Sequence, residues 1–143
     1  MKRIGIACLN TNNAIGQRNN LLYRIPSELR FFKDTTTHTP SNKITNILLM
    51  GRKTFDSIKQ KPLPNRMNLV LSSEYKTLNQ KFHHVSHLQF IPHIREAIDY
   101  SNEYAHLHHN MFVCGGESLY KYFIENNLLD YLVLSKITAP ILH

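Results

Sequence analysis

Two short, uninterrupted apolar runs constrain the fold of this chain more than any other feature. Residues 47–50 (Ile-Leu-Leu-Met) and 69–71 (Leu-Val-Leu) carry no polar side chain. Strands with this composition are buried on both faces, as in a parallel sheet that is covered by helices. Amphipathic segments alternate with the apolar runs, and this alternation predicts an α/β fold.

The expected elements follow from this alternation and from the positions of glycine and proline. The expected strands are residues 3–9, 46–50, 68–71, 82–85, 111–114 and 131–138. The expected helices are residues 26–34, 52–59, 91–100 and 117–126, and the last two carry an apolar stripe at helical spacing. Residues 35–45 are polar and contain Pro40, so we expect a surface loop there.

Length and composition indicate one globular domain over residues 1–143. The chain has 143 residues, of which 42% are hydrophobic and 19% are charged, enough for a substantial core. No apolar run reaches membrane-spanning length, and the first apolar stretch is too short for a signal peptide. We therefore expect a cytoplasmic protein. Cys8 and Cys114 each lie in an apolar run and are expected to be free thiols, although the sequence leaves a disulfide open.

The formal net charge of +7 predicts anionic partners, such as phosphates, carboxylated metabolites or nucleic acid. The basic residues are scattered, so a nucleic-acid surface has weak support. Nine histidines include two clusters, at residues 83–87 and 106–109. Neither cluster has an accompanying cysteine pair or an HExxH pattern, and we expect no metal site.

Two glycine-containing junctions are candidate anion sites. Gly51 follows an apolar run and is followed by an arginine, a lysine and a threonine at the start of an expected helix. The pair Gly115 and Gly116 repeats this arrangement between another strand and helix. Free N–H groups at a helix start attract anions, so two junctions suggest a ligand with phosphates. Neither junction matches GxGxxG or the P-loop, and tight turns or helix caps are the alternative.

Glu28 is the leading candidate for ligand recognition. It stands at the start of an expected helix, with Phe32 four residues later on the same face and Leu29 beside it. A carboxylate beside apolar surface is costly unless hydrogen-bond donors accompany it. A flat ligand with two adjacent N–H groups would satisfy both oxygens. The alternative is an acid that is favoured in the first helical turn by the helix dipole.

Arg66 and residues 12–20 complete the set of candidates. Arg66 follows Pro62 and Pro64, which stiffen the preceding loop, and a fixed guanidinium is a good receptor for a carboxylate. The alternative is a solvated loop arginine. Residues 12–20 are polar, follow the first strand, and are typical of a lid that closes over a cofactor.

In their order and spacing these segments resemble dihydrofolate reductases over essentially the whole chain. The matching segments are residues 15–16, 25–33, 50–58, 62–72 and 115–120. The resemblance implies a three-layer sandwich with a mostly parallel central sheet flanked by helices. It also implies NADPH-dependent reduction of dihydrofolate to tetrahydrofolate, with hydride transfer to the pterin C6 and protonation at N5.

The resemblance assigns catalytic and substrate-binding roles. Glu28 would bind the ring N–H and amino group of the pterin and assist protonation through water. Tyr23 replaces a usual tryptophan and would hold a water molecule, and the hydroxyl of Ser135 would bond the carboxylate. Arg66 would hold the glutamate α-carboxylate of the substrate, with Lys33 as a second cation. The implied substrate site is Ile6, Ala7, Cys8, Leu29, Phe32, Lys33, Ile58, Leu63, Arg66, Cys114 and Tyr120.

The resemblance also assigns a NADPH site. The residues after Gly51 would bind phosphates, Ser72 and Ser73 would approach the adenosine 2′-phosphate, and the second junction would cradle the diphosphate around a cis bond between its glycines. The implied cofactor site is Ala7, Ile15, Gly16, Gly51, Arg52, Lys53, Thr54, Leu71, Ser72, Ser73, Gly115, Gly116, Glu117, Ser118 and Leu119.

The end of the chain departs from the family pattern. Family members continue with two strands that form a hairpin, so we expect this hairpin to be missing and the strand at 131–138 to be a bare apolar edge. A completing C-terminal segment or a partner chain would cover that edge, and the isolated chain is expected to have weak or no activity. The alternatives are a folate- and NADPH-binding remnant, a same-fold reductase of a riboflavin-pathway pyrimidine, and a basic nucleic-acid-binding module. The Pro-Ser-Glu-Leu and Pro-Leu-Pro-Asn-Arg segments argue against the pyrimidine reductase.

Overall fold

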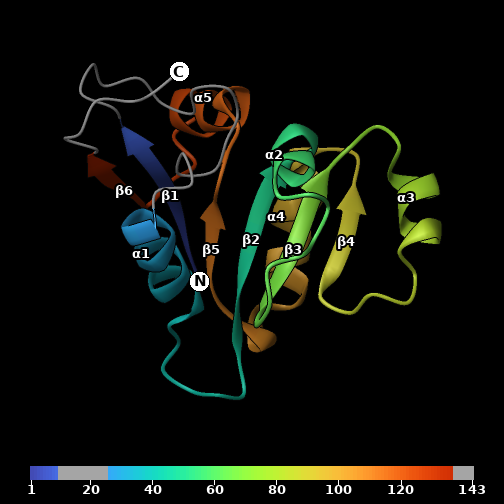
Figure 1. Cartoon of the computed structure of the whole chain (residues 1–143), viewed down its shortest axis with the longest axis horizontal. Helices are drawn as coiled ribbons and strands as arrows, with labels where there is room; N and C mark the ends of the chain where they lie inside the picture. The colour runs from blue at the N-terminus through green and yellow to red at the C-terminus, as the bar shows by residue number, and fades with distance from the viewer. Residues whose placement is uncertain (10–25, 137–143) are drawn as a thin grey trace.

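A single parallel sheet organises the structure, a computed structural model that describes residues 1–9 and 26–136 (Figure 1). Its six strands lie in the order β4-β3-β2-β5-β1-β6, and every neighbouring pair is parallel. The strands are β1 (Lys2–Leu9), β2 (Thr45–Gly51), β3 (Arg66–Leu71), β4 (Leu88–Ile91), β5 (His108–Val113) and β6 (Tyr131–Lys136). The predicted α/β fold with a mostly parallel sheet is confirmed. The part of the expected last strand beyond residue 136 lies outside the described residues.

Helices cover both faces of the sheet and create three layers. They are α1 (Pro26–Thr37), α2 (Arg52–Ser57), α3 (Tyr75–Lys81), α4 (Ile94–Glu103) and α5 (Glu117–Glu125), with a short 3-10 turn, η3 (Ala105–Leu107). Phe32 of α1, Phe55 of α2 and Leu78 of α3 belong to one core cluster. Ala97 of α4 and Phe123 of α5 belong to the other cluster. The first three helices therefore share one face, and α4 and α5 share the opposite face.

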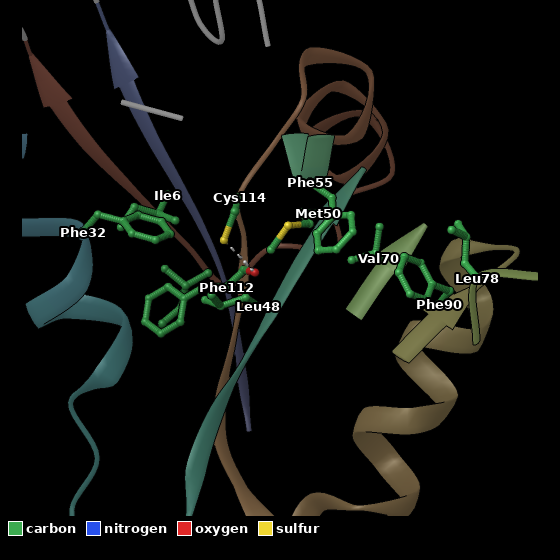
Figure 2. Packing of buried hydrophobic residues seen from close by; sticks show 11 residues of the cluster. Ile6, Phe32, Leu48, Met50, Phe55, Val70, Leu78, Phe90, Phe112 and Cys114 are labelled. Atoms are coloured by element: carbon green, nitrogen blue, oxygen red, sulfur yellow. Dashed lines mark hydrogen bonds between the residues drawn. The ribbon is translucent and has the colours of Figure 1, made fainter. Parts of the chain in front are cut away.

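The apolar run in β2 supplies both cores. Leu48 and Met50 point to the α1–α3 face, whereas Ile47 and Leu49 point to the α4–α5 face, and all four are at most 1% exposed. Successive side chains of a strand alternate between faces, so a doubly covered strand needs apolar residues at every position. Figure 2 shows the α1–α3 core, in which Phe55 packs edge-on against Phe90 with ring centroids 5.4 Å apart.

The carboxyl ends of β2 and β5 create a natural ligand site. These strands are neighbours, with Leu49 opposite Val113. The chain leaves β2 into α2 on one face and leaves β5 into α5 on the other face. In open α/β sheets, ligands bind where the connections from neighbouring strands diverge in this way.

The expected strand at residues 82–85 is wrong, and a helix precedes it instead. Helix α3 ends at Lys81 and is capped by Phe82, whose N–H donates to the Leu78 carbonyl at 2.9 Å, and the edge strand is β4. The segment of α3 carries one fully buried apolar residue, Leu78, so it lacks the stripe that identifies a helix. Asn79 fixes the helix to β4 through two 2.8 Å bonds to the Phe90 backbone.

Three other boundaries also differ from expectation. Helix α1 continues to Thr37, so the expected loop at 35–45 begins with helix. Helix α2 ends at Ser57, and Lys59 and Gln60 adopt positive φ angles of 59° and 56°, which terminates the helix two residues early. Helix α4 begins at Ile94, because residues 88–91 belong to β4.

Cys114 is a free thiol in the α1–α3 core, as predicted. Burial raises the pKa of Cys114, although the charge of Arg66 acts in the opposite direction. The side chain of Cys8 lies outside the described residues. The described helices are all too short or too polar to cross a membrane.

His108, the first residue of β5, predicts a pH-dependent stability. Burial lowers the pKa of His108 below its ordinary value of 6.5, partly offset by hydrogen bonding to Thr45. As the pH falls, His108 therefore takes up its proton at a higher pH in the unfolded chain than in the folded chain. The stabilisation from neutral His108 is complete above about pH 6.5 and is lost as the pH falls below that value. We expect His108→Gln to reduce the loss of stability between pH 7.5 and pH 5.5, measured by urea unfolding at about these two values. His109→Gln is the control, and an equal change in both variants would contradict the assignment.

Candidate functional site

A cleft of about 540 Å³ opens at the carboxyl ends of β2 and β5. Its walls come from the starts of α2 and α5, the two segments that follow the glycine junctions. The lining residues are Gly51, Arg52, Lys53, Thr54, Gly116, Glu117, Ser118 and Lys121. The structure thus brings together most of the residues predicted to bind cofactor phosphates.

The two glycine junctions are bonded to each other. The Gly51 N–H donates to the Gly115 carbonyl at 2.8 Å, and the bond between Gly115 and Gly116 is cis, as the resemblance implies. Gly115 has a φ of 122°, and a Cβ there would stand 3.4 Å from both Thr54 Oγ1 and Tyr120 Oη. Glycine is therefore required at this position, and the cleft floor is backbone.

Helix α5 presents its first turn to this cleft. Gly116 is its N-cap, and no side chain caps the helix. The first N–H groups of a helix have no partner within the helix, and they attract anions. Glu117 and Ser118 are exposed on the cleft wall, whereas Leu119 is buried in the α4–α5 core.

Arg52 links the cleft to the end of β3. Its Nε bonds Asp56 at 3.0 Å, and its Nη1 lies 3.3 Å from Glu74 and 3.4 Å from the hydroxyl of Ser72. Burial raises the pKa of Asp56, but the hydrogen bonds from Gln60 and Arg52 outweigh this effect and hold the pKa below its ordinary value. Arg52 and Ser72, both predicted for the cofactor, therefore lie in one polar network.

The other predicted cofactor residues near β3 lie in different surroundings. Ser73 is exposed beside Ser72. Leu71 is half-buried against the α4–α5 core. Ala7 is buried on that same face with Tyr120, whose hydroxyl donates to the Ile6 carbonyl at 2.7 Å.

A buried apolar cluster lies on the opposite face, between α1 and the sheet. Ile6, Phe32 and Cys114 are each at most 3% exposed and share the α1–α3 core (Figure 2). Ile58 and Leu63 pack half-buried against this core. The structure therefore brings five of the predicted substrate residues into one cluster. Two others, Leu29 and Lys33, are exposed on α1.

Arg66 is the first residue of β3 and is 2% exposed, so the alternative of a solvated loop arginine is wrong. Its Nε donates to the Pro64 carbonyl at 2.8 Å, and its Nη1 donates to Thr36 Oγ1 at 3.0 Å. Burial lowers the pKa of Arg66. Among the described residues no carboxylate forms an ion pair with Arg66, and a buried guanidinium in this situation favours an anionic ligand that compensates its charge.

Thr36 is a site residue that the sequence did not reveal. Its hydroxyl donates to the Phe32 carbonyl at 2.7 Å while it accepts from Arg66. Fully buried Asn46 donates to the carbonyls of Thr36 and His38 at 2.8 and 2.9 Å. The segment that follows residue 34 therefore orients Arg66. This role was not predicted, because residues 35–45 were expected to form a surface loop.

Lys121 is a second residue that the sequence analysis missed. It lines the cleft from α5, four residues after Glu117. Helical spacing could have revealed it, since residues four apart share a face.

Several predicted residues lie outside what the structure describes. Tyr23, Ile15, Gly16 and the proposed lid at 12–20 fall between residues 10 and 25. Glu28 occupies the first turn of α1, as predicted, but its side chain is not described, and the same holds for Cys8 and Ser135. The backbone register places Ser135 beside Cys8 at the carboxyl end of the sheet.

Comparison with known proteins agrees with this geometry. A family profile for dihydrofolate reductase matches residues 4–142. The dihydrofolate reductase of Candida albicans is 32% identical over 139 residues, which cover 94% of this chain and 67% of that protein. The Saccharomyces cerevisiae enzyme is 45% identical over 73 residues, which cover 50% of this chain and 35% of that protein.

Solved structures show the same fold. Schistosoma mansoni dihydrofolate reductase superposes with a TM-score of 0.81 and 28% identity, covering 99% of this chain and 76% of that one. Enterococcus faecalis dihydrofolate reductase in complex with NADP(H) gives a TM-score of 0.72 at 23% identity, over 73% of its length, which supports the fold. The described sheet, the cleft and these matches agree, and the chain belongs to the dihydrofolate reductase family.

Proposed function

We propose that this chain catalyses the NADPH-dependent reduction of dihydrofolate to tetrahydrofolate. The observation that carries the proposal is the cleft between β2 and β5, in which two glycine junctions bond at 2.8 Å beneath cationic walls. The chain belongs to the dihydrofolate reductase family, and this membership supports an oxidoreductase activity.

The cleft fits the phosphates of NADPH. Arg52 and Lys53 supply positive charge from α2, and the first turn of α5 supplies N–H donors beside the Gly115–Gly116 floor. Ser72, whose hydroxyl lies 3.4 Å from Arg52, would bind the adenosine 2′-phosphate. Bound NADPH supplies the hydride.

The α1 side fits the substrate. The pterin and aminobenzoyl rings would pack against the core cluster that contains Phe32 and Ile6, which are 3% and 2% exposed, and Arg66 would offer a buried cation to the glutamate carboxylate. We propose that Glu28 binds the ring N–H and amino group, and so orients the pterin and assists protonation at N5 through water. Ser135 would bond that carboxylate, and Tyr23 would hold the water molecule.

Spectrophotometry with the purified chain tests this function directly. We expect NADPH oxidation that depends on dihydrofolate and stops with a methotrexate-like antifolate. Antifolate and NADPH binding without turnover would support the binding-only remnant instead. Absence of binding to either ligand would contradict both interpretations.

Thr36→Val tests the orientation of Arg66. The substitution removes the hydroxyl that accepts from Arg66 at 3.0 Å, and one such bond contributes about 1 kcal/mol, so we expect KM for dihydrofolate to rise about fivefold. Thr36→Ser should restore the KM. Thr37→Val is the control, since Thr37 makes the same kind of bond, to Lys33, without contacting Arg66. Equal KM changes in Thr36→Val and Thr37→Val would refute the role.

The pairing partner at the edge of the sheet also remains a proposal. Among the described strands β6 is outermost on its side, and Tyr131, Leu132 and Leu134 are 58%, 42% and 48% exposed. A further segment or a partner chain that covers these side chains would protect β6 from aggregation. A cytoplasmic location, a single domain and little binding to nucleic acid likewise remain predictions.

A further inference from the structure

The charges that line the cleft differ in how firmly they are held. The lining contains three cations, Arg52, Lys53 and Lys121, and one anion, Glu117. A diphosphate brings two further negative charges to this site. The existing partners of each cation determine whether it can turn toward such a ligand.

Ion pairs hold the side chain of Arg52 on the α2 side of the cleft. Its guanidinium lies 3.0 Å from Asp56 and 3.3 Å from Glu74, and it also reaches Ser72. Turning toward the centre of the cleft would break both ion pairs. Arg52 therefore acts as a fixed charge.

Lys121 is held weakly on the opposite wall. Its ammonium lies 3.9 Å from Glu125, and the two side chains are 71% and 62% exposed. Exposed pairs of this length contribute little to stability. The lysine side chain is long and flexible, so its ammonium can leave Glu125 at small cost.

The negative charge of Glu117 makes a positive charge at Lys121 favourable for anion binding in the cleft. Its carboxylate is exposed on the cleft wall in the first turn of α5, where it opposes binding of an anion. Lys121 follows by four residues, one helical turn, so its charge lies on the same face. Glu125 follows Lys121 by the same spacing, so Lys121 lies between two carboxylates.

We propose that Lys121 is a cofactor-binding residue that turns from Glu125 to the diphosphate of a dinucleotide in the cleft and offsets the charge of Glu117. This inference rests on the proposed function and assigns one specific contact within it. Lys121 and Lys53 then approach the diphosphate from opposite walls, while Arg52 remains fixed.

Titration of the full chain with NADPH tests the proposal. A charge-assisted hydrogen bond at a partly exposed site predicts that Lys121→Ala raises the Kd about tenfold at low salt. Lys121→Arg should stay close to the parent. Lys43→Ala is the matched control. It also removes one exposed positive charge, but Lys43 precedes the amino end of β2, whereas the cleft lies at the carboxyl end of that strand. The difference between the two alanine variants should shrink at high salt, because salt screens exposed charges.

Two further titrations locate the contact. Lys121→Ala should leave the affinity for 2′-AMP, which lacks the diphosphate, unchanged. Glu125→Gln, which frees Lys121, should tighten NADPH binding about twofold. If the parent binds NADPH and Lys121→Ala binds it as well as Lys43→Ala does, the inference is wrong while the proposed function stands. A parent chain that does not bind NADPH would overturn both.

Discussion

Replacing Glu28 with glutamine should lower kcat for dihydrofolate reduction by about 10²–10³-fold, within the range that a positioned acid or base contributes. Glutamine keeps the size of the side chain but cannot exchange a proton, and one of its two terminal atoms becomes a donor facing the donors of the pterin. The cleft that we propose for the phosphates of NADPH lies at the carboxyl ends of β2 and β5, away from α1. The Kd for NADPH should therefore stay unchanged.

Asp34→Asn is the matched control, since Asp34 is an exposed acid on the same helix. It should retain the activity of the parent. Steady-state kinetics and a NADPH titration on the same preparations check both expectations. Loss of NADPH binding in Glu28→Gln would indicate a folding defect, and full activity in that variant would exclude Glu28 from the reaction.

Replacing Arg66 with leucine should raise KM for dihydrofolate about 100-fold. A guanidinium that binds a carboxylate with two charge-assisted hydrogen bonds contributes about 3 kcal/mol, which corresponds to this factor. The variant should fold, because it removes a buried charge that no carboxylate of the described part of the chain pairs with, which relieves a desolvation cost, and leucine fills most of the space. The urea concentration at the unfolding midpoint of the variant, compared with that of the parent, checks that the variant folds.

A reduced pteridine without the aminobenzoyl-glutamate tail separates the two possible roles of Arg66. If Arg66 binds the tail, parent and Arg66→Leu should reduce this small substrate with equal kcat/KM. An equal loss of activity with both substrates would show that Arg66 acts on the structure of the site and does not bind the carboxylate.

The layered fold could be predicted because burial on both faces leaves a direct trace in sequence. The run through Leu48 and Leu49 has no polar position, and the structure divides it between two cores. The glycine junctions were equally visible, since glycine at Gly115 is required by a φ of 122° and by the nearby Thr54 and Tyr120. These features depend on local geometry, which the sequence encodes directly.

The missed features depend on contacts between segments that are distant in the sequence. Helix α3 is held by Leu78 and by the bonds of Asn79 to β4, so its own sequence carries no periodic stripe. Phe82 and Val85 resembled a short strand because Phe82 packs in the core, with its ring 5.6 Å from that of Phe90. Tertiary packing overrides local pattern in such short elements.

The candidate site shows the same division. The sequence singled out Arg66 as a candidate, but its partner Thr36 lies 30 residues away and on a different element. Lys121 stands four residues after Glu117, which the sequence shows, but the cleft that both residues line is formed only by the fold. Both residues become visible only when the fold brings α1 to β3 and α5 to β2.

The most direct test of the central claim is the fate of a labelled hydride. The chain should be incubated with dihydrofolate and NADPH that carries deuterium at the transferable position of the nicotinamide, and the product should be analysed by mass spectrometry and NMR. We expect tetrahydrofolate with deuterium at C6 and solvent hydrogen at N5. Recovery of unlabelled dihydrofolate alone, from a chain that binds both ligands, would contradict it.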